Sequence, residues 1–273
     1  MRYESLLFLC AGASRVLAAC TRSLLEDATS AYIRAQSSGQ PSLLPLASSN
    51  LSYSENDTPM DISKGVLSQA VTIDFNRSLH DAAQCATFTE ITAATNKHPY
   101  VIHTRMLLDS DNKITTIESV VTDDGDWAFN ATGQLQWTKQ EKWDPISEAK
   151  RDSRAVIKGA GDAYLDQWGN SSIQVPLGTP CARLEGGSYT GQRSPTANTC
   201  KMPAFPNPLK VGNRRYVIDE ELGAVDIFNG FPFLEKSKPA SYSVPSSNLI
   251  RVEEGKIRYI HEVTVCLTPH CGR

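Results

Sequence analysis

No apolar run in this sequence is long enough to span a bilayer, which takes roughly 20 residues. The most apolar stretch, residues 6–13, is short, and Glu4, Ser14 and Arg15 interrupt its surroundings. Charge of one sign is also scarce, because the formal net charge is −3 and both signs are interspersed. Such a surface gives no electrostatic reason to bind nucleic acid or an anionic membrane, so we expect neither as a partner.

Several catalytic motifs are missing as well. The chain contains no Gly-x-Ser-x-Gly nucleophile elbow and no glycine-rich phosphate-binding loop. His270 and Cys271 together with Cys266 could suggest a metal, but an oxidising compartment favours a disulfide. We therefore expect a site for a small-molecule substrate that uses neither a metal nor a cofactor.

Residues 1–19 resemble a secretory signal peptide, since Arg2 precedes the apolar stretch and small residues lie around position 18. Its removal would also remove Cys10 and leave an even set of six cysteines, which indicates three disulfides. We expect the pairs Cys20–Cys85, Cys181–Cys200 and Cys266–Cys271, with Cys20–Cys271 as an alternative. These features predict a protein that is secreted or held in the lumen of the secretory pathway.

Asn-x-Ser/Thr sequons fit the same route and predict glycosylated surface loops. They lie at Asn50, Asn56, Asn76, Asn130 and Asn170. Some of the five are chance matches in a chain rich in serine and threonine.

The rest of the chain repeats itself. Tyr32 and Tyr164 lie in similar helical stretches, Glu55 and Glu185 follow in loops, and residues 111–121 resemble residues 254–264. This order predicts two similar domains, 20–138 and 154–273, joined by a linker at 139–153 and packed as a pseudo-dimer.

Each half places helix before strands. Leu24, Leu25, Ala28, Tyr32 and Ala35 follow helical spacing, residues 152–168 form the matching helix, and residues 62–79 could supply a short additional one. Alternating runs such as 100–108, 113–122, 215–219 and 256–265 then predict strands. The expected fold class is α+β: two tandem, disulfide-bonded, cone-shaped domains with helices packed on a curved antiparallel sheet.

Four segments carry a resemblance to known proteins: residues 249–260 (LIRVEEGKIRYI), 179–191 (TPCARLEGGSYTG), 213–219 (NRRYVID) and 125–131 (GDWAFNA). They resemble the nuclear transport factor 2-like superfamily, which includes ketosteroid isomerase, scytalone dehydratase and SnoaL-type cyclases. Within it, the chain looks like a fungal secreted ketosteroid-isomerase-like family associated with maleidride formation. Related sequences tend to have Asp-Ser-His where this chain has Ser246-Ser247-Asn248, and this departure weakens any transfer of mechanism.

The resemblance implies a catalytic carboxylate at Glu185, at the place where ketosteroid isomerase carries its general base. A buried carboxylate has a raised pKa and suits proton abstraction beside a carbonyl. Tyr164 would donate to the enolate oxygen, and Arg183 would clamp a carboxylate or anhydride. The alternatives are that Glu185 only pairs with Arg183 and that Tyr164 only packs.

Further binding residues are expected on the second-half strands. Arg215 is predicted to face the cavity with Tyr216 outward, and Tyr189 and Tyr216 complete the candidate binding set. His103 and His261 could shuttle protons, but polar strand positions usually face solvent, which is our first expectation for both.

The sequence therefore predicts a cofactor-free cyclase or isomerase of secondary metabolism, with the dimerising cyclisation of maleic anhydride units as its narrowest form. The alternative is a non-catalytic secreted module that binds a metabolite or a host component. A companion protein or a homodimer is a possible partner, and the second half is expected to hold the active cavity.

Overall fold

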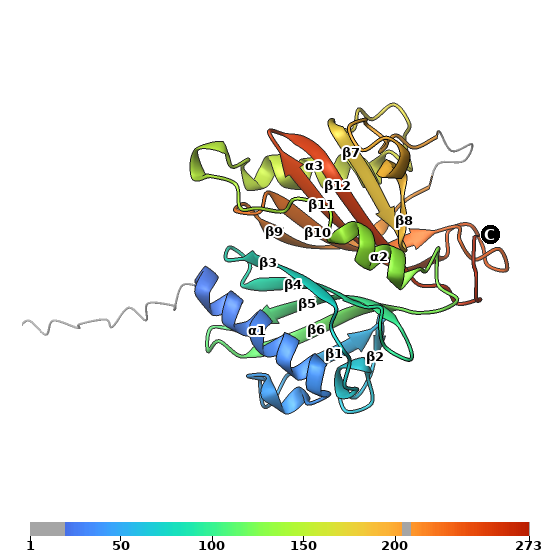
Figure 1. Ribbon diagram of the computed structural model, residues 1–273. Helices are drawn as coiled ribbons and strands as arrows, with labels where there is room; N and C mark the ends of the chain where they lie inside the picture. Colours follow the sequence, from blue (N-terminus) through green and yellow to red (C-terminus); the bar gives the residue numbers. More distant parts are fainter. Residues whose placement is uncertain (1–19, 204–208, 273) are drawn as a thin grey trace, which may run out of the picture.

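The fold consists of two six-stranded sheets that lie against each other, each with a long helix on its outer side (Figure 1). The computed structural model describes residues 20–203 and 209–272. The signal peptide predicted at residues 1–19 lies outside the described residues. No helix in the described ranges is long and apolar enough to cross a membrane.

The first half runs from α1 to β6. Its elements are α1 (Arg22–Ser38), β1 (Ser52–Glu55), β2 (Thr58–Pro59), β3 (Phe75–Asp81), β4 (Ala86–Ala93), β5 (Tyr100–Leu108) and β6 (Ile114–Thr122), with 3₁₀ turns at Pro41–Leu43 and Val66–Ser68. The additional helix that residues 62–79 suggested is absent from this described segment, which holds only the second 3₁₀ turn and the start of β3. Pairing of β3 with β4 determines the local structure there.

The second half repeats this order from α3 to β12. Its elements are α3 (Arg154–Asp166), β7 (Leu177–Glu185), β8 (Ser188–Tyr189), β9 (Gly212–Asp219), β10 (Ala224–Pro232), β11 (Ser243–Glu253) and β12 (Lys256–Thr264), with a 3₁₀ turn at Thr190–Arg193. Between the halves lie α2 (Ala131–Thr138) and a 3₁₀ turn at Glu148–Lys150.

The two sheets have one topology. Their strand orders are β2-β1-β6-β5-β4-β3 and β8-β7-β12-β11-β10-β9. In each, the first strand runs parallel to the last, while the other neighbours are antiparallel. The tandem α+β arrangement expected from the internal repeat is therefore present.

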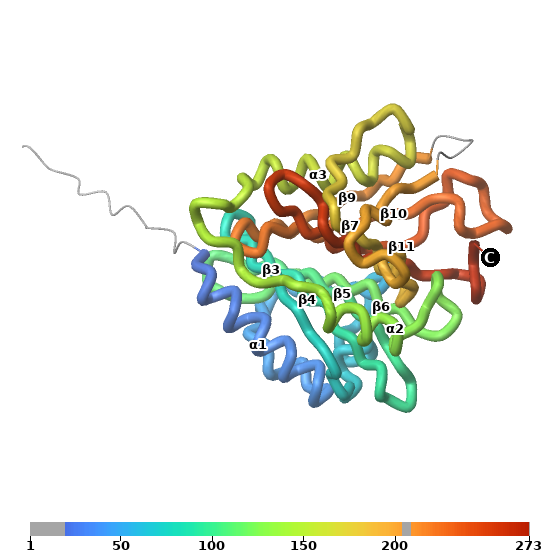
Figure 2. The backbone as a smooth tube through the Cα atoms, turned by 45° about the horizontal axis from the view of Figure 1, so that its top comes forward, coloured from blue at the N-terminus to red at the C-terminus, as the bar shows by residue number. Residues whose placement is uncertain are grey.

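Each sheet has a helix face and an inter-sheet face. On the helix face of the first sheet, α1 covers one apolar core and contributes Tyr32 to it. On the helix face of the second sheet, α3 covers a separate apolar core and contributes Tyr164. A third core fills the space between the sheets and includes Phe88, Phe228 and Leu249. The tube view shows the halves stacked in this way, with α2 beside their junction (Figure 2).

Contacts between the halves are reciprocal. Arg22, the first residue of α1, binds Asp219 of the second half at 2.9 Å, and Arg154, the first residue of α3, binds Asp81 of the first half at 2.6 Å. His103 meets its repeat counterpart Ser247 at 2.8 Å. A position that touches its own counterpart lies on a two-fold axis, so the halves form a pseudo-symmetric pair.

The segment expected to be a linker is packed mainly against the second half, and Trp143 also contacts the first half, because the Arg77 guanidinium lies 4.0 Å from its ring centroid. Glu141 is bonded to His261, the backbone N–H of Ile146 donates to Glu221 O at 2.7 Å, and Asp152 accepts from the N–H of Gly255 at 2.8 Å. Residues 139–153 therefore form part of the junction.

Candidate functional site in the second half

Tyr164, Arg183 and Glu185 lie together on the helix face of the second sheet. An Arg183 Nη1–Glu185 Oε1 ion pair of 2.5 Å joins the two β7 side chains. Tyr164 extends from α3 and is 1% exposed, and burial together with nearby negative charge raises its pKa. Its hydroxyl is beside the Arg183 guanidinium but makes no well-formed hydrogen bond to any described residue.

Close packing of α3 positions Tyr164. The Ser153 side chain caps the helix by accepting from Val156 N, and the apolar stripe of α3 then faces the sheet. At Gly161, a Cβ would lie 2.8 Å from Ile227 Cδ1. The absence of that atom brings the helix near to the strands, so Tyr164, one turn later, points at β7 and β12.

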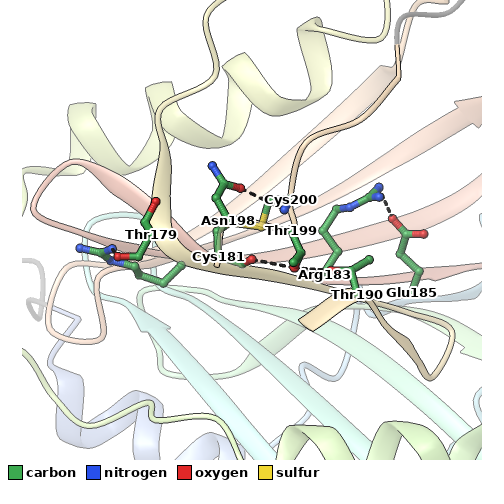
Figure 3. Close-up of a disulfide and its surroundings, with 9 residues drawn as sticks. Thr179, Cys181, Arg183, Glu185, Thr190, Asn198, Thr199 and Cys200 are labelled. Atoms are coloured by element: carbon green, nitrogen blue, oxygen red, sulfur yellow. Dashed lines mark hydrogen bonds and ion pairs between the residues drawn. A yellow bond between two sulfur atoms is a disulfide. The ribbon is translucent and has the colours of Figure 1, made fainter. Parts of the chain in front are cut away.

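A disulfide-bonded loop fixes β7 beside the site (Figure 3). Cys181 bonds Cys200, and Thr199 Oγ1 donates to Cys181 O at 2.9 Å. Thr190 Oγ1 is 2.9 Å from Thr199 Oγ1 and accepts from Arg183 N at 2.8 Å. The Arg183 and Glu185 side chains project together from the side of β7 that faces away from the first-half strands.

Glu262 is a fourth member that the sequence interpretation missed. It pairs directly with Glu185 across β12 and β7 and is only 4% exposed. Burial, followed by the charge of Glu185, raises its pKa to about 8, and Thr264 Oγ1 donates to it at 2.9 Å. Glu262 is therefore largely protonated at neutral pH, whereas Arg183 balances the charge of Glu185.

Polar residues continue across the helix face in two rows. The first row runs Glu185–Glu262–Asn248 and the second runs Thr264–Ser246–Asn229, each along direct cross-strand pairs. Asn248 and Asn229 are each 1% exposed, yet Asn248 Nδ2 and Asn229 Oδ1 have no partner among the described residues. Buried polar atoms are rarely left unsatisfied, so these atoms require an explanation.

The first half has neutral, satisfied or apolar residues at the same register positions. Its first row is Glu55–Ser119–Thr104, and its second is Val121–Ile102–Ile91. Tyr32 Oη, Thr104 Oγ1 and Ser119 Oγ form a continuous chain with distances of 2.7 and 2.8 Å. Glu55 accepts hydrogen bonds from the Tyr53 hydroxyl and from Val66 N, and these two bonds give its carboxylate a structural role.

Arg215 and Tyr216 have orientations opposite to those predicted. Tyr216 points to α3, where its hydroxyl donates to Asp162 at 2.8 Å. Arg215 points toward the first half and binds Asp57 at 2.6 Å. Adjacent residues of a strand face opposite sides of the sheet. A prediction that is wrong by one position therefore exchanges the faces of Arg215 and Tyr216.

The expectation that His103 and His261 face solvent is wrong. Both are fully buried between the sheets. His261 lies between Glu90 (2.8 Å) and Glu141 (2.6 Å), whose charges outweigh burial and raise its pKa to about 9. Neither histidine reaches the helix face that holds the other candidate residues.

Tyr189 lies beside the site without entering its rows. Its ring stacks on Trp137 of α2 with centroids 4.8 Å apart. Backbone contacts hold the same region, since Asn130 N donates to Gly186 O at 2.5 Å. The helix between the halves thus supports the turn that follows Glu185.

The predicted sequon asparagines differ in what their side chains already do. Asn50, Asn76, Asn130 and Asn170 are exposed, although Asn130 Oδ1 caps α2 by accepting from Gly133 N and Asn170 Oδ1 accepts from Ser172. Asn56 instead holds β1 to β6, because its Nδ2 donates to Val121 O and its Oδ1 accepts from Val121 N. A glycan on Asn56 would replace one hydrogen of the donating amide.

The described cysteines form the three expected disulfides, Cys20–Cys85, Cys181–Cys200 and Cys266–Cys271. These bonds fit an oxidising compartment. Glu235, Cys266 and Cys271 place ligand atoms within 4.8 Å of one another, but both sulfurs belong to a disulfide. Glu235 accepts from Leu267 N and Thr268 N, so this group is poorly suited to a metal.

A known family matches this half of the chain. Residues 150–264 match a domain of unknown function (DUF8021). The match begins just before α3 and ends at the last residue of β12, so it contains every member of the two polar rows. No curated protein matches the chain.

Proposed function

We propose that the second half binds a small, largely apolar metabolite under α3 and catalyses cofactor-free proton transfer on it, as a cyclase or isomerase. On this proposal the halves, 20–138 and 154–273, are tandem ketosteroid-isomerase-like domains of the nuclear transport factor 2-like superfamily. The protein would act after secretion or in the secretory lumen, and the three disulfides support that location.

The difference between the two helix faces supports this proposal most strongly. At the register positions of the two rows, the first half carries satisfied or apolar residues, whereas the second carries charged and incompletely paired ones. Elsewhere in the first-half interior, Gln36 Oε1 and Thr87 Oγ1 are also unpaired among the described residues. A stable core needs only satisfied or apolar residues, because unpaired buried polar atoms lower stability. Proteins keep unpaired buried polar atoms chiefly at sites where those atoms contribute to function.

Proton abstraction accounts for the separate environments of the two carboxylates. Glu185, partly exposed beside Arg183, would accept the proton from a carbon next to a carbonyl. The electron pair would move to the carbonyl oxygen, where Tyr164 and protonated Glu262 would donate hydrogen bonds to the enolate. Return of the proton to another carbon completes an isomerisation. Attack of the enolate carbon on a second unit instead forms one carbon–carbon bond, and the enolate formed on that unit then attacks the first unit to close the ring, with the last negative charge taking the proton held by Glu185.

The narrowest form of the proposal is the coupling of two maleic anhydride units into a carbocycle. Anhydride oxygens are acceptors, and the Tyr164 hydroxyl, the Arg183 guanidinium and Asn248 Nδ2 are the donors of this site. A companion protein or a second copy of the chain remains compatible with this reaction.

Comparison of metabolites from a strain that lacks the gene with those of its parent would test the function. We expect one product to disappear and an uncyclised or unisomerised precursor to accumulate. Purified protein should convert that precursor, Glu185→Gln should abolish conversion with the melting temperature kept, and the matched first-half variant Glu55→Gln should retain it. Full activity in Glu185→Gln would favour the non-catalytic binding module instead.

A further inference from the structure

In the second-half interior, the unpaired polar atoms that donate hydrogen bonds are separated in space from the one that accepts. Asn248 Nδ2 lies in the first row and can donate a hydrogen bond, and the Tyr164 hydroxyl, which lies beside the Arg183 guanidinium toward β7, is a further donor. Asn229 Oδ1 lies at the second row and can only accept. The helix face therefore has a donor end and an acceptor end.

Hydrogen bonds around Asn229 explain why its oxygen is free. Its Nδ2 donates to Ile227 O at 2.9 Å, which fixes the amide with Oδ1 directed elsewhere. The neighbouring hydroxyls are engaged with one another and not with Asn229, because Thr264 Oγ1 is 2.9 Å from Glu262 Oε1 and 2.8 Å from Ser246 Oγ. Asn229 can be satisfied only by a group that the described chain does not supply.

We propose that this interior binds a ligand with two polar ends: a carbonyl or carboxylate oxygen at the donor row, and a hydroxyl donating to Asn229 Oδ1. Asn248 of β11 and Asn229 of β10 are diagonal neighbours on adjacent strands, about 7 to 8 Å apart, so one six-membered ring spans the distance between them. This inference rests on the proposed function of the same cluster and adds the class of molecule it takes.

Aromatic side chains beside Asn229 suit a flat ligand body. Trp168 and Phe231 pack edge to face with centroids 4.8 Å apart, and both belong to the apolar core around Tyr164. In the first half, Ile91 occupies the position of Asn229 and offers no acceptor. Selectivity for a hydroxyl is thus specific to the second half.

A matched pair of probes tests the acceptor end: 4-hydroxybenzoate, with a carboxylate and a hydroxyl across one ring, and benzoate, which lacks the hydroxyl. By calorimetry, the wild-type protein should bind the hydroxylated probe about tenfold more tightly, since an unmade hydrogen bond leaves Asn229 unsatisfied. Asn229→Val should remove this preference while benzoate still binds, and Asn229→Ala provides the same test if the valine variant does not fold.

Equal affinity for the two probes, a preference that survives both variants, or binding of neither probe would overturn the inference. The proposed function fails separately, because it depends on turnover of the precursor. Loss of turnover in Glu185→Gln without any hydroxyl preference would refute only the ligand class. A hydroxyl preference together with full turnover in Glu185→Gln would refute only the catalytic role.

Discussion

At the scale of single residues, two neighbouring glutamates have opposite properties because their surroundings differ. Glu185 reaches the edge of the second-half site and is paired with Arg183. Glu262 is buried one strand away and keeps its proton to about pH 8. A carboxylate whose pKa is raised by burial, next to one that is paired with an arginine, is an arrangement that suits acid–base chemistry.

Replacement of Glu262 by glutamine should change the pH dependence more than the rate. Protonated Glu262 donates a hydrogen bond, so turnover of the wild-type protein should fall as pH rises through about 8, the value to which burial raises its pKa. A glutamine side chain cannot ionise and still donates, so Glu262→Gln should lose about tenfold in rate yet keep that rate at pH 9. Rate measurements from pH 5.5 to 9.5 check this.

An unchanged alkaline decline in Glu262→Gln would contradict the assignment of that decline to Glu262. Asp126 provides a control, because its pKa is raised to about 6 by burial but it lies outside the two rows. The Asp126→Asn variant should therefore show the wild-type profile above pH 7.

The sequence predicted three of the four clustered residues at this scale. Tyr164, Arg183 and Glu185 could be found because they belong to recognisable motifs or repeat positions. Glu262 could not be predicted because neighbours on a strand face opposite sides, and the sequence alone does not say whether His261 or Glu262 faces the helix. Only the pairing of β12 with β7 establishes that Glu262, and not His261, faces the helix.

At the scale of secondary-structure elements, the same strands form a core in one half and a polar site in the other. The helices were predictable from apolar spacing, and α1 and α3 lie within a few residues of the expected bounds. The missing helix near residues 62–79 shows the limit of such patterns. Strand β3 forms through pairing with β4, and local sequence does not contain that information.

Exchange of a first-row residue for its first-half counterpart should stabilise the protein and damage the site. Asn248→Thr introduces the residue found at Thr104 and removes an unpaired buried amide. We expect a gain of about 1 kcal/mol, or about 3 °C in melting temperature, together with weaker ligand binding. Thermal unfolding and the benzoate titration measure the two effects.

The reverse exchange is the matched control. Thr104→Asn breaks the hydroxyl chain that joins Tyr32 to Ser119, so it should lower the melting temperature and leave benzoate binding intact. A loss of stability in Asn248→Thr would mean that Asn248 supports the fold rather than the site.

At the scale of the whole molecule, a polar network holds the halves together, and no local sequence pattern predicts it. Glu90 of β4 accepts from Arg77, Gln134 and His261, which lie far apart in the sequence. The internal repeat predicted a pseudo-dimer, but repeat positions alone do not say which faces meet. The buried histidines and carboxylates became interpretable only once the two sheets were placed face to face.

This junction should make the protein less stable in alkali. Neighbouring carboxylates raise the pKa of His261 to about 9, and burial raises that of Asp226 to about 8. Both groups bind protons more tightly in the folded state than in the unfolded chain, so their contribution is present at low pH and is lost as pH rises through the folded values. The melting temperature should fall by about 10 °C between pH 7 and 9.

Calorimetry across this range, with Asp226→Asn for comparison, distinguishes the two groups. His261 causes slope across the whole range from pH 7 to 9, whereas Asp226 and the buried Glu262 of the second half contribute only below about pH 8. An asparagine side chain cannot ionise, so the variant should show a shallower slope between pH 7 and 8 and the wild-type slope between 8 and 9. The pKa of Glu90 is lowered by His261 and Arg77, so its own contribution is lost only in strong acid and does not obscure the alkaline slope. A melting temperature that stays constant from pH 7 to 9 would show that the junction does not hold these protons. The halves would then have to be joined mainly by the apolar core between the sheets and by the reciprocal arginine–aspartate pairs.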